Sequence, residues 1–185
     1  MSLVFKCLKC SSCCVFKSDV DYPRVFPWEK RFLEEKAISY GFDKPVFKPD
    51  IVYLDPVRGV YVVVLYKWVI NGKCLFNKDG KCIIHGEHPL ACRMYPLIVN
   101  YSDKTLRVSL LCNWVRENKE FIERGIDPSR VFNNELKYAV KAFTYISLMI
   151  ESLEKTGFMK VDPSEIDTSR EIIDYDMYVQ ENQEN

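Results

Sequence analysis

The placement of its cysteines limits this chain more than any other feature of the sequence. A first cluster, Cys7-x-x-Cys10-x-x-Cys13-Cys14, places three thiols at successive three-residue steps, and Cys74, Cys82, Cys92 and Cys112 follow after about sixty residues. A short loop with that spacing can wrap one metal centre, and thiolates are ligands for zinc and for iron–sulfur clusters. The predicted metal ligands are therefore Cys7, Cys10, Cys13, Cys14, Cys74, Cys82, Cys92 and Cys112.

Length and composition indicate a globular protein. The 185 residues, 48% of them hydrophobic, suit one domain with an appendage and can bury a substantial core. The chain has no apolar run long enough to cross a membrane, and its N-terminus lacks the apolar core of a signal peptide. We expect a soluble, cytoplasmic protein without a membrane partner. In that compartment metal binding is favoured over the two alternatives, disulfides and buried free thiols.

Charge is distributed unevenly along the chain. Residues 1–150 carry 23 basic and 16 acidic side chains, whereas residues 151–185 carry 3 and 10. We predict a cysteine-cluster metal-binding domain over 1–162 and an acidic C-terminal tail over 163–185, which either solubilises the protein or lies across a basic face. Because no basic run with interleaved aromatic residues is present, we expect no nucleic-acid partner; a protein partner or substrate is expected instead.

The hydrophobic pattern changes period along the chain. A strand-like run at 60–69 (VYVVVLYKWV) is rich in β-branched and aromatic residues and predicts a central strand, while apolar positions after residue 128 recur at three and four residues. Asn71-Gly72, Asp79-Gly80 and Ser102–Lys104 predict tight turns. The predicted strands are 3–6, 51–54, 60–69, 97–101 and 105–111, and the predicted helices are 27–40, 114–124 and 128–156. The fold class is therefore α+β: a small antiparallel sheet, metal-binding Cys loops, an N-terminal helix and long C-terminal helices.

Two segments carry a family resemblance. CLKCSSCC near the N-terminus and GKCLFNKDGKCIIHGEHPLACRMYP further on resemble the CxxCxxCC zinc- or iron-chelating family, the YkgJ-type cysteine-cluster proteins. The usual pattern there is C-x2-C-G-x-C-C, then G-x-C, C-x-I-Y and R-P-x-x-C-R-x-x-P, with eight cysteines in all. The resemblance covers about residues 5–112 and implies metal binding by the eight cysteines. Some relatives are linked to flagellin lysine N-methylation.

This chain departs from the family pattern at three positions. Ser11 stands where the family usually has Gly, so the first loop is expected to turn differently. His85 replaces the usual Tyr and His88 the usual Arg, which places both histidines of the chain in the second cluster as ligands, proton relays or solvent-facing side chains. Arg93 is either a donor to the cluster sulfurs or a surface residue. Tyr95 and Trp114 are assigned to the core.

The sequence does not decide which thiols share a metal centre or which metal they bind. The cysteines divide into two four-thiolate sites or supply one site with spare thiols. Cys7, Cys10 and Cys13, completed by Cys92, match the spacing of a ferredoxin-type site. An iron–sulfur cluster would permit redox or protein-modifying, methyl-transfer-like chemistry, although no nucleotide or methyl-donor motif is visible. The alternative is a Zn²⁺-stapled protein-interaction module without catalysis. No catalytic residue is assigned.

Overall fold

A computed structural model describes residues 3–101, 103, 105–125 and 127–183 of the chain. It contains two compact units, each built from two separate stretches of sequence. The cysteine unit comprises Met1–Asp21 and Ile70–Thr144, and the sheet unit comprises Tyr22–Val69 and Tyr145–Asn185. The predicted division near residue 162 does not coincide with these units, and that domain assignment stays a prediction.

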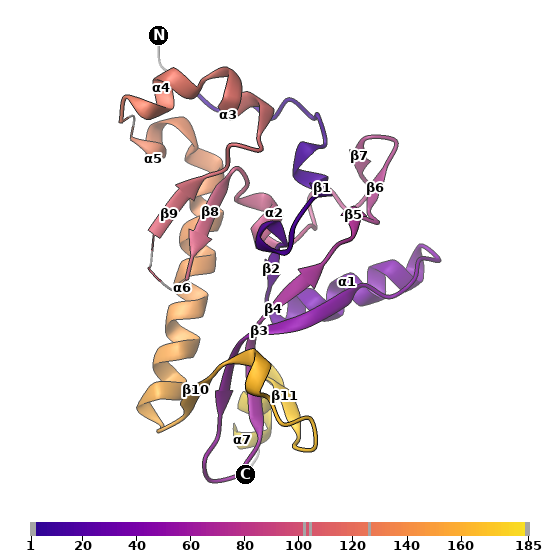
Figure 1. The fold of residues 1–185 in the computed structure, drawn as a ribbon, viewed down its shortest axis with the longest axis vertical. Coiled ribbons are helices and arrows are strands. Elements are labelled where there is room, and N and C mark those ends of the chain that lie inside the picture. The colour runs from indigo at the N-terminus through magenta and orange to yellow at the C-terminus, as the bar shows by residue number, and fades with distance from the viewer. Residues whose placement is uncertain (1–2, 102, 104, 126, 184–185) are drawn as a thin grey trace. The chain divides into compact units, whose positions relative to one another are not determined.

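The sheet unit is organised around one long hairpin. Its strands β3 (Val46–Leu54) and β4 (Tyr61–Val69) pair antiparallel, as the strand-like run predicts (Figure 1). β10 (Met159–Val161) extends the sheet beside β3, while β2 (Arg24–Val25) and β11 (Ile172–Asp174) pair with different stretches of β4. Because both edges of β4 are paired and residues 62–65 are fully buried, β4 is the central strand of this core.

Helix α1 (Pro27–Ser39) forms as the sequence predicts. Pro27 occupies its first position, and the Glu29 carboxylate accepts a hydrogen bond of 3.0 Å from the Phe26 amide, which satisfies a free donor at the helix start. Leu33 and Ala37 are fully buried. The helix ends at Ser39, and Gly41 follows with a φ of +72°, which suits a residue without a Cβ.

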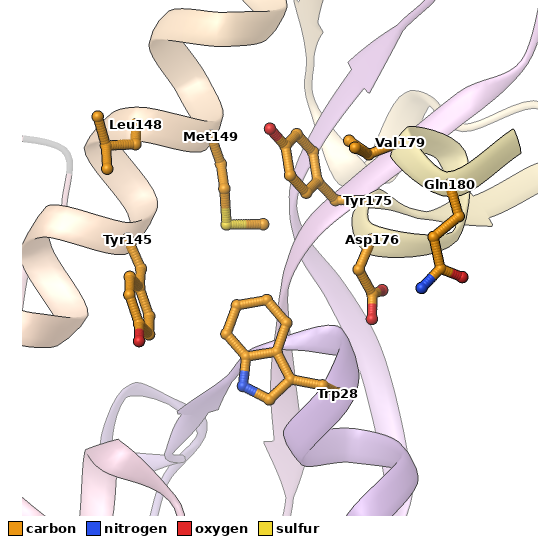
Figure 2. Close-up of a pocket in the computed structure, with 8 residues that line it drawn as sticks. All are labelled: Trp28, Tyr145, Leu148, Met149, Tyr175, Asp176, Val179 and Gln180. Atoms are coloured by element: carbon orange, nitrogen blue, oxygen red, sulfur yellow. The ribbon is translucent and has the colours of Figure 1, made fainter. Parts of the chain in front are cut away.

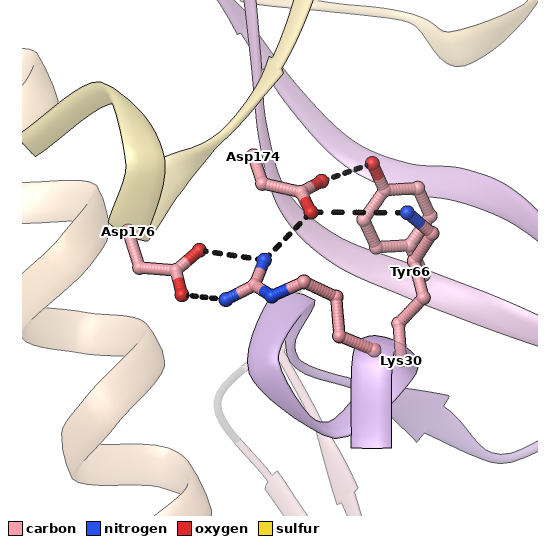
Figure 3. Close-up of polar contacts among 5 residues, drawn as sticks. Lys30, Tyr66, Asp174 and Asp176 are labelled. Carbon is pink, nitrogen blue, oxygen red and sulfur yellow. Dashed lines mark hydrogen bonds and ion pairs between the residues drawn. The ribbon is translucent and has the colours of Figure 1, made fainter. Parts of the chain in front are cut away.

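The acidic C-terminal segment is integrated into the sheet unit. After the short 3-10 helix η3 (Pro163–Glu165), β11 runs parallel to β4, and α7 (Tyr175–Gln183) follows. The Asp174 carboxylate accepts hydrogen bonds from the Tyr66 hydroxyl and from Arg31 Nη1, at 2.9 Å for the latter (Figure 3). Lys30 Nζ lies 3.7 Å from Asp174, and Arg31 also pairs with Asp176. These contacts tie the segment to α1 and β4.

The cysteine unit consists of short elements. Near the N-terminus it has the 3-10 helices η1 (Ser12–Cys14) and η2 (Asp19–Asp21). Its paired strands are β1 (Val15–Phe16) with β5 (Gly72–Lys73), β6 (Asn77–Lys78) with β7 (Lys81–Cys82), and β8 (Leu97–Asn100) with β9 (Thr105–Val108). Its helices are α2 (Leu90–Arg93), α3 (Asn113–Glu117), α4 (Lys119–Glu123), α5 (Pro128–Val131) and the start of α6 (Asn133–Lys155).

Three local predictions differ from the structure. Residues 3–6 form no strand; the Phe5 amide instead donates to the Val131 carbonyl at 2.8 Å. The helix predicted at 114–124 breaks at Asn118, where the side-chain amide donates to the Trp114 carbonyl. The helix predicted at 128–156 breaks at Phe132, whose buried ring contacts Phe5 and Trp114. In each case tertiary packing overrides the local pattern.

The fold class is α+β, as predicted, with one parallel pairing, β4 with β11, in addition to the antiparallel ones. Apolar residues of α6 are buried at alternating three- and four-residue steps, as in Ala139, Ala142, Ile146, Met149 and Leu153. Ser102 and Lys104 of the predicted third turn lie outside the described residues. Within the described part of the chain, no helix is long and apolar enough to span a membrane.

Candidate metal centre

The first cysteine loop turns through left-handed backbone positions. Ser11 has φ +61° and ψ +8°, the conformation that glycine adopts most easily, which accounts for a glycine at this position in the resemblance pattern. The Ser11 hydroxyl donates a hydrogen bond of 2.6 Å to the Gly80 carbonyl. The loop therefore keeps the turn that a glycine would make, and the serine side chain fastens it to the 79–80 turn.

Strand pairing then brings Cys14, Cys74 and Cys82 to one place. Val15 pairs with Lys73, and the Cys74 amide donates to the Cys14 carbonyl at 2.8 Å. Asp79 and Gly80, both with positive φ, form the predicted two-residue turn of a type I′ hairpin. Through that hairpin Cys82 faces Asn77, whose amide donates to the Cys74 carbonyl at 3.0 Å.

Helix α2 presents Cys92. The Cys92 amide donates to the Pro89 carbonyl at 2.9 Å, which starts the helix. Arg93 donates to the carbonyls of His88 (2.7 Å) and Gly86 (2.6 Å), and its guanidinium lies 5.6 Å from the centre of the Tyr138 ring. The described partners of Arg93 are thus backbone carbonyls, so it fixes the loop before Cys92 instead of acting on sulfurs.

One set of thiols is linked through Cys7, whose charge acts on both Cys13 and Cys112. The pKa of Cys13 is raised by the hydrogen bond to Cys14, by burial and by the charges of Cys14, Cys92 and Cys7. Burial raises the pKa of Cys112, and the charges of Cys10 and Cys7 add to this effect. Cys112, which is 7% exposed, therefore lies near the N-terminal loop despite its remoteness in sequence. We call Cys7, Cys10, Cys13, Cys92 and Cys112 the first thiol group.

A second set surrounds Cys14. Burial raises the pKa of Cys74 to about 12, with further contributions from the charges of Cys14 and Cys82. Burial and the charge of Cys14 likewise raise the pKa of Cys82. The pKa of Cys14 itself is lowered, chiefly by its hydrogen bond with Cys13, and the nearby Asn77 side-chain amide and the charge of Lys73 lower it further. We call Cys14, Cys74 and Cys82 the second thiol group.

These side chains suit a thiolate metal centre in their chemistry. All eight cysteines are free thiols. The sulfur atoms of Cys13 and Cys14 are 3.9 Å apart, so the two thiol groups adjoin each other at this pair. Among the described residues, no three His, Cys, Asp or Glu side chains are arranged to hold an ion without adjustment. Metal binding would therefore draw the thiols of a group together.

The two histidines stack on each other with ring centres 5.0 Å apart. The Gly86 amide donates to Nδ1 of His88 at 3.0 Å, which fixes this nitrogen as an acceptor. Burial, together with the charges of His85 and Arg93, lowers the pKa of His88 to about 4. His88 is therefore neutral at physiological pH and supports the turn before α2.

Two polar residues of this region are not predicted as site residues from the sequence. Asn77 is 7% exposed, and neither its Nδ2 nor its Oδ1 has a hydrogen bond of acceptable geometry among the described residues. The buried Tyr95 hydroxyl is in the same state. The position of Asn77 two residues before Asp79-Gly80 was the available signal, because a two-residue hairpin places it opposite Cys82. Tyr95, assigned to the core, carried no comparable signal.

The sheet unit contains a separate apolar pocket of about 390 Å³ (Figure 2). Trp28, Tyr145 and Met149 form part of its wall, and the remaining lining residues are Leu148, Tyr175, Asp176, Val179 and Gln180. Trp28 stacks on Phe26 with ring centres 4.7 Å apart. Asp176 is already paired with Arg31, so its charge is not available to a ligand. We base no function on this pocket.

Comparison with models of protein families gives a match. The model of a family named CxxCxxCC, described as "Putative zinc- or iron-chelating domain", matches residues 6–113. That range contains all eight cysteines and exceeds half of the chain. No curated protein and no solved structure matches the chain.

Proposed function

Since the chain belongs to the CxxCxxCC family of zinc- or iron-chelating domains, we propose that its cysteine unit holds two neighbouring metal centres, one in each thiol group. The observation that carries the proposal is the position of the adjacent pair Cys13 and Cys14. The Cys13 and Cys14 thiols contact each other, with sulfur atoms 3.9 Å apart, and each also has partners of its own. The charges of Cys92 and Cys7 act on Cys13, whereas the charge of Cys14 also acts on Cys74 and Cys82. We therefore assign the two adjacent residues to neighbouring centres.

The first thiol group has the composition of an iron–sulfur site. Cys7, Cys10 and Cys13 supply the C-x2-C-x2-C run, and Cys92, whose charge acts on Cys13, is the fourth thiolate that such a run requires. Cys112 is a further thiol of this group. An iron–sulfur cluster supplies electron transfer when bound, and on this basis redox or protein-modifying chemistry belongs to the proposal. We assign no substrate.

The second thiol group supplies three thiolates from paired strands. Burial favours the protonated form of Cys74 and Cys82, so these thiols would lose protons when a zinc or iron ion binds. Strand pairing fixes the backbone of Cys14 and Cys74 through the 2.8 Å hydrogen bond between them. These residues would therefore act as a rigid chelating frame.

A zinc-stapled module without catalysis is the second candidate. It is favoured by the two-residue strands β1, β5, β6 and β7, which are too short to stabilise this part of the unit alone. A closed zinc–thiolate site would contribute folding energy in their place. In that case the unit would present a protein-binding surface instead of reactive metal.

The proposal is tested by metal and acid-labile sulfide analysis of anaerobically purified protein, together with its visible spectrum. The unaltered protein is compared with two double variants, Cys74→Ser/Cys82→Ser and Cys92→Ser/Cys112→Ser. We expect each double variant to lose one centre and keep the other. Loss of all metal in both would show a single centre, and zinc without sulfide would favour the staple.

A matched control keeps the test specific. Ser12→Ala alters the loop without removing a thiol, although it removes the contact of 3.3 Å between Ser12 Oγ and Cys10 Sγ. We expect its metal content to equal that of the unaltered protein. Metal content unchanged in both cysteine double variants would refute thiolate chelation.

A further inference from the structure

Each thiol group contains one buried polar side chain without a described hydrogen-bond partner. In the second group this is Asn77, which is 7% exposed and has both amide atoms unpaired among the described residues. Leaving such an amide unpaired in a protein interior costs roughly 1–3 kcal/mol. Since Asn77 lies next to three thiols, we expect a sulfur atom of these thiols to be the hydrogen-bond partner of its amide.

The backbone fixes the position of Asn77 among these thiols. Its amide donates to the Cys74 carbonyl at 3.0 Å, and it pairs across the hairpin with Cys82. Its side-chain amide also lies near Cys14. Asn77 therefore contacts or faces every member of the second thiol group.

Tyr95 has the corresponding place in the first thiol group. Its hydroxyl is buried and makes no hydrogen bond of acceptable geometry within the described part of the chain, although Ser109 lies nearby. The Tyr95 amide donates to the Cys92 carbonyl at 3.4 Å, which fixes the residue beside this thiol group. Cys112, Cys13 and Cys10 are close enough for their charges to act on the phenol. A phenolic O–H can donate one hydrogen bond.

We propose that Asn77 and Tyr95 are positioning residues that donate hydrogen bonds to metal-bound thiolates, Asn77 in the second thiol group and Tyr95 in the first. A thiolate carries negative charge and accepts hydrogen bonds that a neutral thiol accepts only weakly. Donors of this kind orient the ligands and tune the metal, and their removal weakens metal binding by about 10- to 100-fold. This inference rests on the proposed function.

The experiment uses Asn77→Leu and Tyr95→Phe, which remove the polar atoms and keep most of the volume. Metal-free protein is titrated with Co²⁺, whose thiolate charge-transfer absorption reports coordination, and Co²⁺ is then displaced by a chelator of known affinity. Urea unfolding is measured with and without Co²⁺. The two variants act as controls for each other, because each is expected to affect a different thiol group.

We expect opposite effects in the two states of the protein. Without metal, both variants are as stable as the unaltered chain or more stable, because an unpaired buried polar group is gone. With Co²⁺, Asn77→Leu weakens one class of site by about 10- to 100-fold and shifts its charge-transfer band, and Tyr95→Phe does the same at the other class. A purely structural role would not change the absorption band.

Other outcomes separate the inference from the proposed function. If the unaltered protein binds no Co²⁺ through thiolates, the proposed function fails and the inference fails with it. If the unaltered protein binds Co²⁺ and both variants keep its affinity and spectrum, the inference alone is overturned. If Asn77→Leu fails to fold, Tyr95→Phe, which removes a single oxygen atom, decides the question by the same measurements.

Discussion

Asp174 is the residue at which the acidic C-terminal segment is most firmly attached to the sheet unit. Its carboxylate accepts hydrogen bonds from Tyr66 and Arg31, has Lys30 as a further cation, and is only 13% exposed. We expect Asp174→Ala to destabilise the sheet unit substantially. The variant also leaves the largely buried Tyr66 hydroxyl without this acceptor, and a buried donor without an acceptor destabilises the folded state.

The magnitude follows from the two charge-assisted hydrogen bonds that are lost. Each is worth about 1.5–3 kcal/mol when desolvated, but the Arg31 side chain is 35% exposed, so its bond contributes less. We therefore expect a loss of about 2–4 kcal/mol in the free energy of unfolding. Tyr66→Phe removes one of the two bonds and should cost about 1–2 kcal/mol.

The assay is urea unfolding followed by tryptophan fluorescence in a Trp114→Phe background. The remaining tryptophans, Trp28 and Trp68, both belong to the sheet unit, so the signal reports that unit. Glu181→Gln is the matched control, because both side chains of the Arg58–Glu181 pair are exposed and the pair should contribute little to stability. A loss below about 1 kcal/mol for Asp174→Ala, or one equal to that of the control, would contradict the reasoning.

Three further outcomes are expected. Apparent metal affinity should rise with pH, because thiols such as Cys74, whose pKa is raised to about 12, must release protons to bind a metal. A weakly buffered Zn²⁺ titration measures this proton release. Zn²⁺ binding without proton release would contradict the expectation. Metal-free protein should lose stability as pH rises from about 9 toward 12. In this range the Cys74 thiol ionises in the unfolded chain but stays protonated in the folded one, which favours the unfolded state. Midpoints of urea unfolding measured across that pH range provide the check. Ser11→Gly should change the free energy of unfolding by less than about 1 kcal/mol, because glycine adopts the left-handed conformation without strain, which offsets the lost hydrogen bond to the Gly80 carbonyl. A larger loss of stability in thermal unfolding would show that the side-chain hydrogen bond dominates.

The sequence predicts the regular elements that local pattern determines. Helix α1 and the β3–β4 hairpin follow from Pro27, Gly41 and the β-branched run at 60–69, and the Asp79-Gly80 turn follows from its residue types. The breaks at Asn118 and Phe132 are not predicted, because they depend on contacts with residues distant in sequence. The same holds for β11, a three-residue strand that pairs with β4 only in the folded chain.

The candidate site shows the same division. Spacing alone predicts the eight cysteines as ligands, but their proposed grouping depends on strand pairing and on the 3-10 turn η1. The position of Arg93 beside Cys92 suggests a sulfur donor, whereas its described hydrogen-bond acceptors are the carbonyls of Gly86 and His88. Candidate ligands can thus be predicted from the sequence, whereas their spatial grouping and their polar neighbours cannot.

The division of the cysteine unit between two stretches of chain has a consequence for biosynthesis. Cys7–Cys14 leave the ribosome first, and Cys112 is made about a hundred residues later. At about 5–20 residues per second, roughly 5–20 s pass between the synthesis of the N-terminal thiols and that of Cys112. During that interval residues 22–69 of the sheet unit are also synthesised. If the proposed centres form, the early thiols would meanwhile be open to oxidation or to binding of a wrong ion, and the timing of metal delivery would become part of how this protein matures.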